Sequence, residues 1–295
     1  APSDHAVSPE EVEMAAIWSD VLDVPSVGRD QNFFEAGGDS IRAIQVAARA
    51  RSAGMGVTPA LLLENQTIAM LCVAARRVVI PETRSEQGSL FGEVPLPSIV
   101  QWFQDLAFEV PSHFNQAVVL TTPSDLAPAM LEAGLQILAE HHDALRLRLD
   151  AAGQEWTLAY AAPGGEGRFR HEALGELSAG ERAAAITSMA RQAHETIDPT
   201  HGPLWNAVQV TFREDEPGRL IWVVHHIGVD GFSWGILIED LAEVCAALRD
   251  GREPAFRRAR KRSSYRQWVD SWVSASSSAS LQHERDIWLA QPYHA

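Results

Sequence analysis

The sequence predicts two folding units in tandem, a small four-helix bundle followed by a larger α/β lobe. Residues 1–77 carry apolar side chains at helical spacing and show no strand-like alternation. Residues 78–94 have no period and are interrupted by proline and glycine, as in a linker. In residues 95–295, helix-like and strand-like segments alternate, which is typical of an α/β lobe. A chain of 295 residues is long enough for two ordinary domains.

The bundle begins with a well-defined helix start. Ser8 suits the N-cap, Pro9 the first helical position, and Glu11 lies three residues after the cap. We expect a second helix after residue 40, a short helical turn near residues 58–63 and a last helix beyond it. The apolar positions expected to face the core are Met14, Ile17, Trp18 and Val21 in the first helix, Ile41, Ile44 and Ala48 in the second, and Ile68, Leu71, Cys72 and Ala75 in the last.

Strand and helix patterns follow each other through the lobe. Short apolar or alternating runs predict strands, and a period of about 3.6 residues predicts helices. A serine-rich stretch at residues 274–280 separates two late helices. The predicted strands lie at residues 117–120, 145–149, 156–160, 204–212 and 221–224, and the predicted helices carry Leu131, Leu135 and Leu138, then Leu237, Leu241, Val244, Cys245 and Leu248.

Composition excludes several classes of function. The net charge of −15 argues against nucleic acid or an anionic membrane as the main partner. No apolar run approaches the ~20 residues that span a bilayer, and no basic-then-apolar leader begins the chain, so we expect a cytoplasmic protein. Cys72 and Cys245 lie on apolar helical stripes and are expected to be reduced core thiols. Lys261 is the single lysine, which indicates the coding bias of a GC-rich bacterium.

The segment FFEAGGDS, residues 33–40, is the most informative in the bundle. It places Ser40 behind two glycines and Asp39, at the start of a predicted helix, where backbone N–H groups favour an attached phosphate. The segment resembles the attachment site of peptidyl carrier domains in nonribosomal peptide synthetases. This resemblance implies that Ser40 carries 4′-phosphopantetheine, installed by a phosphopantetheinyl transferase, and that Asp39 belongs to the same cofactor site.

The segment HHIGVDG, residues 225–231, is the corresponding feature of the lobe. Histidines at the end of an apolar strand can move protons near neutral pH, and the Asp-Gly pair can turn the chain. The pattern resembles the H-H-x-x-x-D-G motif of the condensation-domain superfamily. The superfamily has the chloramphenicol-acetyltransferase fold and includes condensation, epimerization and cyclization domains. The resemblance implies that His226 is catalytic and that His225, Asp230 and Gly231 are structural.

Two further expectations concern the surroundings of this motif. Residues 142–146, HDALR, resemble the His-x-x-Leu-Arg segment of the superfamily, so Arg146 is the expected ionic partner of Asp230. A His-His pair could also suggest a metal site. Adjacent strand residues point to opposite faces, however, so His225 and His226 cannot readily share one ion, and we expect no metal.

Three features of the sequence favour the epimerization branch. The Gly-Gly-Asp-Ser form of the carrier motif resembles carriers that feed epimerization domains. Residues 99–103, IVQWF, resemble the epimerization motif P-I-Q-x-W-F, from which they depart at Ser98 and Val100. Residues 113–116, HFNQ, and 229–234, VDGFSW, also look more like epimerization than condensation sequences.

The resemblance implies a reaction on a tethered substrate, the L/D epimerization of an aminoacyl or peptidyl thioester. An upstream adenylation domain would supply the substrate, and a downstream condensation domain would take the D form. The alternatives are a condensation domain that forms peptide bonds and a catalytically silent lobe that docks the carrier. The superfamily pairs the second histidine with a glutamate in an E-G-H-G-R-E motif of a second lobe. That motif does not occur here, so we expect a chain with the N-terminal lobe only, which is incomplete as an isolated enzyme.

A basic cluster stands out in this acidic chain, and two interpretations of it remain open. It can be a solvated loop, or it can be a docking surface for the phosphate arm or for an acidic carrier face. The cluster consists of Arg257, Arg258, Arg260, Lys261 and Arg262.

Overall fold

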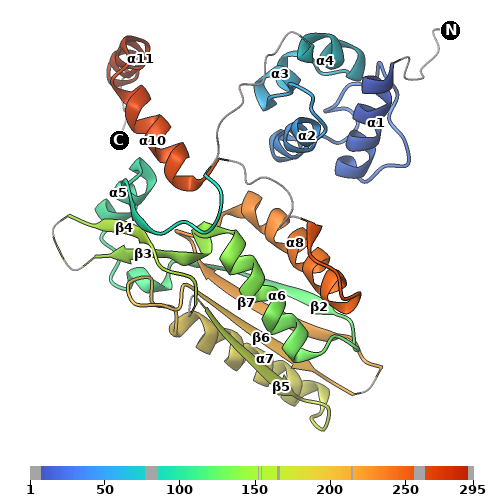
Figure 1. Cartoon of the computed structure of the whole chain (residues 1–295), viewed down its shortest axis with the longest axis vertical. Coiled ribbons are helices and arrows are strands. Elements are labelled where there is room, and N and C mark those ends of the chain that lie inside the picture. Colours follow the sequence, from blue (N-terminus) through green and yellow to red (C-terminus); the bar gives the residue numbers. More distant parts are fainter. Residues whose placement is uncertain are drawn as a thin grey trace. The chain divides into compact units, whose positions relative to one another are not determined.

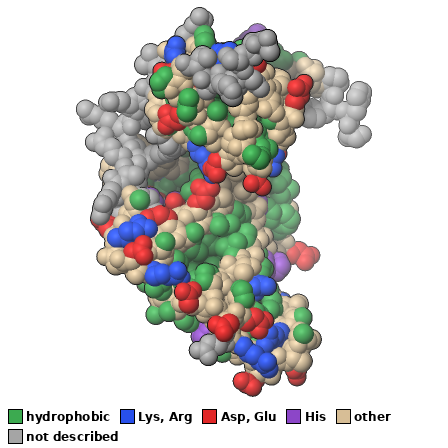
Figure 2. All heavy atoms as spheres, turned by 90° about the vertical axis from the view of Figure 1, so that its right-hand side faces the viewer, with side chains coloured by type: hydrophobic (Ala, Val, Ile, Leu, Met, Phe, Trp, Pro, Cys, Tyr) green, Lys and Arg blue, Asp and Glu red, His purple; other side chains and the backbone are tan. Residues whose placement is uncertain are grey.

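The chain folds into two compact units, Ala1–Glu82 and Thr83–Ala295, in the computed structural model (Figure 1). Figure 2 shows acidic and basic side chains interspersed with apolar ones on the face that it presents. Within the described part of the chain, no helix is both long and apolar enough to cross a membrane. The structure describes residues 8–76, 86–151, 153, 155–164, 167–213, 215–255 and 263–291.

The first unit is the predicted four-helix bundle. Its helices are α1 (Pro9–Leu22), α2 (Ser40–Ser52), α3 (Pro59–Glu64) and α4 (Ile68–Ala75). Every helix starts at a side-chain cap whose oxygen accepts a backbone N–H of the first turn, which satisfies a group that the helix leaves without a partner. The caps are Ser8, Asp39, Thr58 and Thr67.

The inner face of α2 differs from the prediction. Ile41 and Ile44 are 60% and 41% exposed, whereas Ala43 and Ala47 are buried. The buried stripe also contains Val46 and Ala50. Small side chains at this spacing let α2 pack closely against α1 and α3, so packing selects the alanine face. The two isoleucines therefore face outwards on the helix that Ser40 begins.

The second unit contains two sheets. A three-stranded antiparallel sheet has the order β1-β4-β3, and a four-stranded sheet has the order β2-β7-β6-β5, in which only β5 and β6 are parallel. The strands are β1 (Gly92–Val94), β2 (Asn115–Thr122), β3 (Leu147–Asp150), β4 (Thr157–Tyr160), β5 (Gly167–Ala173), β6 (Trp205–Thr211) and β7 (Gly218–His225). The α-helices are α5 (Ser98–Asp105), α6 (Pro128–His141), α7 (Ala179–Glu195), α8 (Gly231–Arg249), α10 (Tyr265–Ser276) and α11 (Ala279–Leu289).

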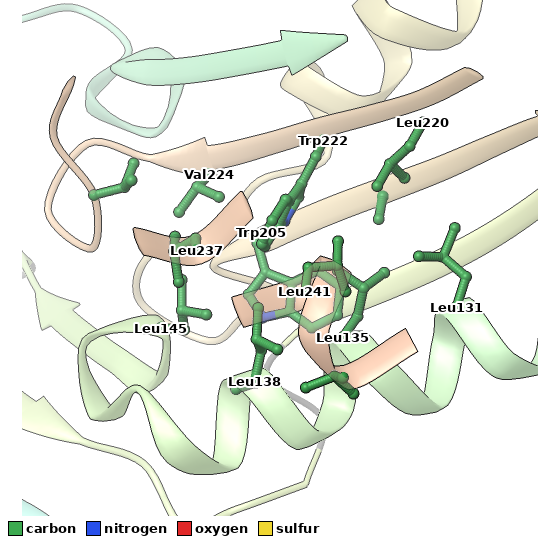
Figure 3. Close-up of a cluster of buried hydrophobic side chains, with 14 of the residues drawn as sticks. Leu131, Leu135, Leu138, Leu145, Trp205, Leu220, Trp222, Val224, Leu237 and Leu241 are labelled. Carbon is green, nitrogen blue, oxygen red and sulfur yellow. The ribbon is translucent and has the colours of Figure 1, made fainter. Parts of the chain in front are cut away.

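Helices cover both faces of the larger sheet. On one face, α6 and α8 pack over Trp205 and Trp222, with leucines from both helices between them (Figure 3). On the other face, α7 covers Val208, Val210 and Ile221. α7 also forms the crossover between the parallel strands β5 and β6 (Figure 1). β7 is a central strand of this covered sheet, and the HHIGVDG segment begins where it ends.

Most predicted elements of the lobe are present, and two predictions need correction. Residue Leu145 lies in a 3₁₀ turn, η2 (Asp143–Arg146), that precedes β3 instead of in the strand itself. Residues 86–94, predicted as linker, belong to the second unit, since β1 pairs with β4 and Leu90 is buried. Residues 77–85 and the basic cluster lie outside the described residues.

Candidate functional site

Ser40 is the first residue of α2 and its side chain is exposed. The preceding residue, Asp39, has extended backbone, and its carboxylate accepts the N–H of Arg42 at 2.8 Å. Asp39 is therefore the helix cap, a role that the sequence analysis did not assign to it. The Ser40 hydroxyl makes no hydrogen bond to any residue that the structure describes. It is thus available for modification at a helix N-terminus.

The two glycines before this cap make the tight turn that exposes the serine. Gly37 has φ +97°, a backbone conformation that favours glycine. A Cβ on Gly38 would lie 2.4 Å from the ring of Phe33 and 2.6 Å from its carbonyl oxygen. Phe33 is itself fixed in the core by an edge contact with Trp18, with ring centroids 4.8 Å apart.

These residues fit a covalently attached phosphopantetheine. The attachment atom is an exposed serine hydroxyl, and the first turn of a 13-residue helix favours the phosphate that joins the arm to it. When attached, the arm supplies a flexible thiol that holds an acyl group as a thioester. Asp39 contributes by capping the helix, and its direct contact with the cofactor stays a prediction.

In the second unit, the histidine motif lies where β7 ends. β2 pairs with β7 so that Asn115 is opposite His225, and the His226 N–H donates to the Phe114 carbonyl at 2.8 Å. The His226 ring stacks on the Phe114 ring at a centroid distance of 4.9 Å. The edge of the sheet thus holds both the backbone and the ring of His226.

The hydrogen bonds of His226 define its two ring nitrogens. Nδ1 lies 2.9 Å from the carbonyl oxygen of Val229, and a carbonyl only accepts, so Nδ1 carries the proton. Nε2 is then the basic nitrogen. It lies 2.9 Å from Nε2 of Gln116.

His225 is fully buried, and its ring nitrogens are both hydrogen-bonded. Its Nδ1 accepts the N–H of Ile227 at 3.3 Å, and its Nε2 donates to the Pro111 carbonyl at 3.0 Å. Burial, with a smaller contribution from the nearby His226, lowers the pKa of His225 to about 4. A neutral, doubly hydrogen-bonded ring fits the structural role predicted for His225.

The pKa of His225 predicts how stability depends on pH. In the unfolded chain a histidine has a pKa of about 6.5. As the pH falls from there towards 4, the unfolded state binds this proton first, so folding stability decreases by up to about 3 kcal/mol. We expect the loss of unfolding free energy between about pH 7 and about pH 4.5 to be clearly smaller in His225→Gln, measured by urea unfolding.

The exposed residue His201 provides the control for this measurement. His201→Gln should keep the pH dependence of the wild type, since the His201 side chain is 82% exposed. Equal pH dependence in His225→Gln and the wild type would contradict the assignment.

The structure corrects the predicted pair of Asp230 and Arg146. Asp230 is exposed and caps α8, where its Oδ1 accepts the Ser233 N–H at 2.7 Å and the Ser233 hydroxyl at 2.6 Å. Arg146 is buried and pairs instead with Asp143, three residues earlier on the same 3₁₀ turn, at 2.7 Å. Asp230 is thus satisfied as a helix cap, and Arg146 is satisfied by its ion pair with Asp143. Gly231 opens α8, and a Cβ there would meet nothing within 4 Å.

A cavity of about 330 Å³ adjoins the motif. Most of its lining is apolar or aromatic, and the ionisable side chains among its lining residues are those of His226, Asp230 and Tyr265. Burial raises the pKa of Tyr265 to about 12, so its hydroxyl stays protonated at neutral pH. The cavity is lined by Ile99, Val100, Trp102, Phe103, Phe114, Ala144, His226, Ile227, Gly228, Val229, Asp230, Ser233, Tyr265 and Trp268. It can accept an apolar group beside the His226 imidazole.

Sequence reasoning assigned no contact to Gln116 or Trp234. Both occur in segments that it singled out, HFNQ and VDGFSW. Gln116 is 110 residues from His226, and only the register of β2 against β7 brings them together.

Comparison with known proteins agrees with both units. A family model described as "Condensation domain" matches residues 92–294, and one described as "Phosphopantetheine attachment site" matches residues 13–73. A component of the linear gramicidin synthase of Brevibacillus parabrevis is 39% identical over 99% of this chain and 4% of its own length. Surfactin synthase subunit 2 of Bacillus subtilis (strain 168) is 33% identical over 93% of this chain and 8% of its own length. The chain therefore spans a small fraction of these relatives.

Solved structures give the same assignment for the second unit. The epimerization domain from the third module of tyrocidine synthetase B is 28% identical with a TM-score of 0.65, over 72% of this chain and 48% of that one. The starter condensation domain of the rhizomide synthetase RzmA shares the fold, at 21% identity and a TM-score of 0.56, over 68% of this chain and 48% of that one. The chain belongs to the condensation-domain family of nonribosomal peptide synthetases, as a phosphopantetheine-bearing carrier domain followed by a condensation-superfamily α/β domain.

Proposed function

We propose that the second unit catalyses L/D epimerization of an aminoacyl or peptidyl thioester held on the Ser40 arm. The observation that carries the proposal is His226, whose basic Nε2 is defined by the Val229 contact and whose ring lines an apolar cavity. The likeness to an epimerization domain at 28% identity supports this branch of the superfamily.

The proposed chemistry needs a base beside the α-carbon. His226 Nε2 takes the α-proton next to the thioester carbonyl, and a solvent water gives a proton to the opposite face of the enolate. His226 then passes its proton to the resulting hydroxide, so the net change is inversion at that carbon. A tethered substrate has a high effective concentration, which helps a weakly acidic C–H to react. Val229 keeps Nδ1 engaged, so Nε2 is the nitrogen that exchanges protons, and the Gln116 amide releases Nε2 when the substrate binds.

Isotope exchange tests the proposal directly. The chain is loaded with an aminoacyl phosphopantetheine on Ser40 and incubated in deuterated water. We expect deuterium at the α-position of the recovered amino acid, detected by mass spectrometry, because removal and return of the proton exchange it with solvent. Ser40→Ala should accept no arm and show no label. A fully loaded chain that forms an amide with an acceptor while its α-position stays unlabelled would contradict epimerization.

Peptide-bond formation is the second candidate, because the family model that matches residues 92–294 is that of condensation domains. The same loaded chain is offered an acceptor aminoacyl thioester. Amide formation without α-deuteration would favour condensation. We propose a phosphopantetheinyl transferase, an adenylation domain and a further condensation domain as partners of either reaction.

A further inference from the structure

We propose that Gln116 and Trp234 are positioning residues that hold the His226 imidazole in one tautomer and orientation. Neither residue lines the cavity, and both would act through His226. The effect on activity rests on the proposed function, whereas the effect on the ring itself can be observed without any substrate.

The sheet register brings Gln116 to His226. Gln116 pairs with Val224 in the antiparallel ladder, two residues before His226, so the two side chains are diagonal neighbours on the same side of the sheet. This is the side that α6 and α8 cover, with Val118, Val224 and Trp222 in its core.

The first turn of α8 brings Trp234 to the same place. Its indole packs edge-on against Trp222, with ring centroids 5.2 Å apart and an interplanar angle of 84°. The indole N–H donates to Gln116 Oε1 at 2.9 Å. Since the core contact fixes the indole, the position of this donor is fixed as well.

Donor and acceptor chemistry then determines the orientation of the amide. An indole N–H can only donate, so the Gln116 oxygen faces Trp234 and its NH₂ group faces His226. An NH₂ group also only donates, so His226 Nε2 must accept. The Val229 carbonyl independently requires the proton on Nδ1. The two ends of the ring therefore specify the same neutral tautomer.

The neighbouring histidine shows that this tautomer is a local choice. His225 accepts at Nδ1 and donates at Nε2, the reverse of His226. The sequence places two identical side chains in succession, and their partners give them opposite proton positions. Gln116 and Trp234 explain why Nε2 of His226 carries no proton and accepts a hydrogen bond.

Nitrogen NMR of the histidine rings in the intact chain tests the proposal without activity. Protonated and unprotonated ring nitrogens have well-separated ¹⁵N resonances, and His226→Gln identifies the signals of His226. We expect wild-type His226 to carry its proton on Nδ1 near neutral pH. Trp234→Phe should give a mixture of tautomers, because the amide can then turn its oxygen towards Nε2, whereas Gln116→Leu should keep the Nδ1 proton that the Val229 carbonyl holds. The matched control Gln192→Leu, on the exposed face of α7, should keep the wild-type spectrum.

Gln116→Glu provides the second arm, because a carboxylate only accepts and draws a proton onto Nε2. We expect the acidic limb of the pH–rate profile for α-deuteration to move up by about one pH unit. Trp234→Phe should lower kcat for exchange about 10- to 100-fold with an unchanged fraction of loaded arm, because a proton on Nε2 removes the base.

A wild-type His226 with its proton on Nε2 would overturn the proposal, as would Trp234→Phe and Gln116→Glu variants with wild-type spectra and pH profiles. If the wild type shows the Nδ1 proton but never exchanges the α-proton, the proposed function fails while the positioning role stands.

Discussion

Replacing His226 by glutamine should lower the rate of α-deuteration by about 10²- to 10⁴-fold, because the reaction loses its positioned base. Glutamine can still reach the Val229 carbonyl and the Gln116 amide, so the loop is expected to keep its shape. The measurement is the initial rate of deuterium uptake into the tethered aminoacyl group, normalised to the fraction of loaded Ser40 determined by mass spectrometry.

The control for this experiment is His201→Gln. His201 is an exposed histidine that pairs with Asp198 and does not line the cavity. It should leave exchange unchanged. Wild-type exchange in His226→Gln would contradict the catalytic assignment and favour a lobe that only docks the carrier.

The sequence predicted the features that depend on local chemistry. Ser8 caps α1 as expected, and the residues of the FFEAGGDS segment form the turn at a helix N-terminus. The apolar run at 221–224 lies inside β7 and delivers His225 and His226 to the end of that strand. Helix caps, turns and buried strands depend on residues that are adjacent in the sequence, so they can be predicted from a single sequence.

Features that depend on packing between distant segments were missed or misassigned. The prediction for α2 followed the larger side chains, Ile41 and Ile44, but the bundle buried the alanine face. α7 was missed because three of the five apolar residues that it packs against the sheet are alanines, which gives a weak apolar period. The prediction of an Asp230–Arg146 pair relied on resemblance and could not foresee that Asp143 lies closer to the guanidinium.

Gln116 illustrates the limit in the site itself. The HFNQ segment that contains it was singled out as a motif. Its partner, His226, can be identified only from the register of β2 against β7. A shift of one residue between β2 and β7 would turn Gln116 to the opposite face. The contact to His226 is therefore a property of the sheet, not of either segment.

Arg146→Leu should reduce the unfolding free energy of the second unit by about 3–5 kcal/mol. Arg146 is 0% exposed, and its side chain hydrogen-bonds to five groups from four segments. Its partners are the carbonyls of Ala139 and Glu140 at the end of α6, of Ala161 after β4 and of Leu90 before β1, and the carboxylate of Asp143. The substitution removes the cation that compensates the buried carboxylate and leaves four carbonyls without this donor.

Urea unfolding of the variants separates the ionic part of this loss from the rest. Arg285→Leu, which removes an exposed ion pair with Asp286, should change stability by less than about 1 kcal/mol. Adding Asp143→Asn to Arg146→Leu should restore part of the loss, since the amide oxygen can still accept the Leu90 N–H and no buried charge remains. An Arg146→Leu variant as stable as the wild type would contradict the stabilising role of Arg146.

A double variant less stable than Arg146→Leu would show that the carbonyl contacts, and not the charge, determine the loss of stability. The predicted recovery would mean that Arg146 stabilises this lobe by compensating the charge of Asp143. Asp230 does not take part in that pair and caps α8 next to His226.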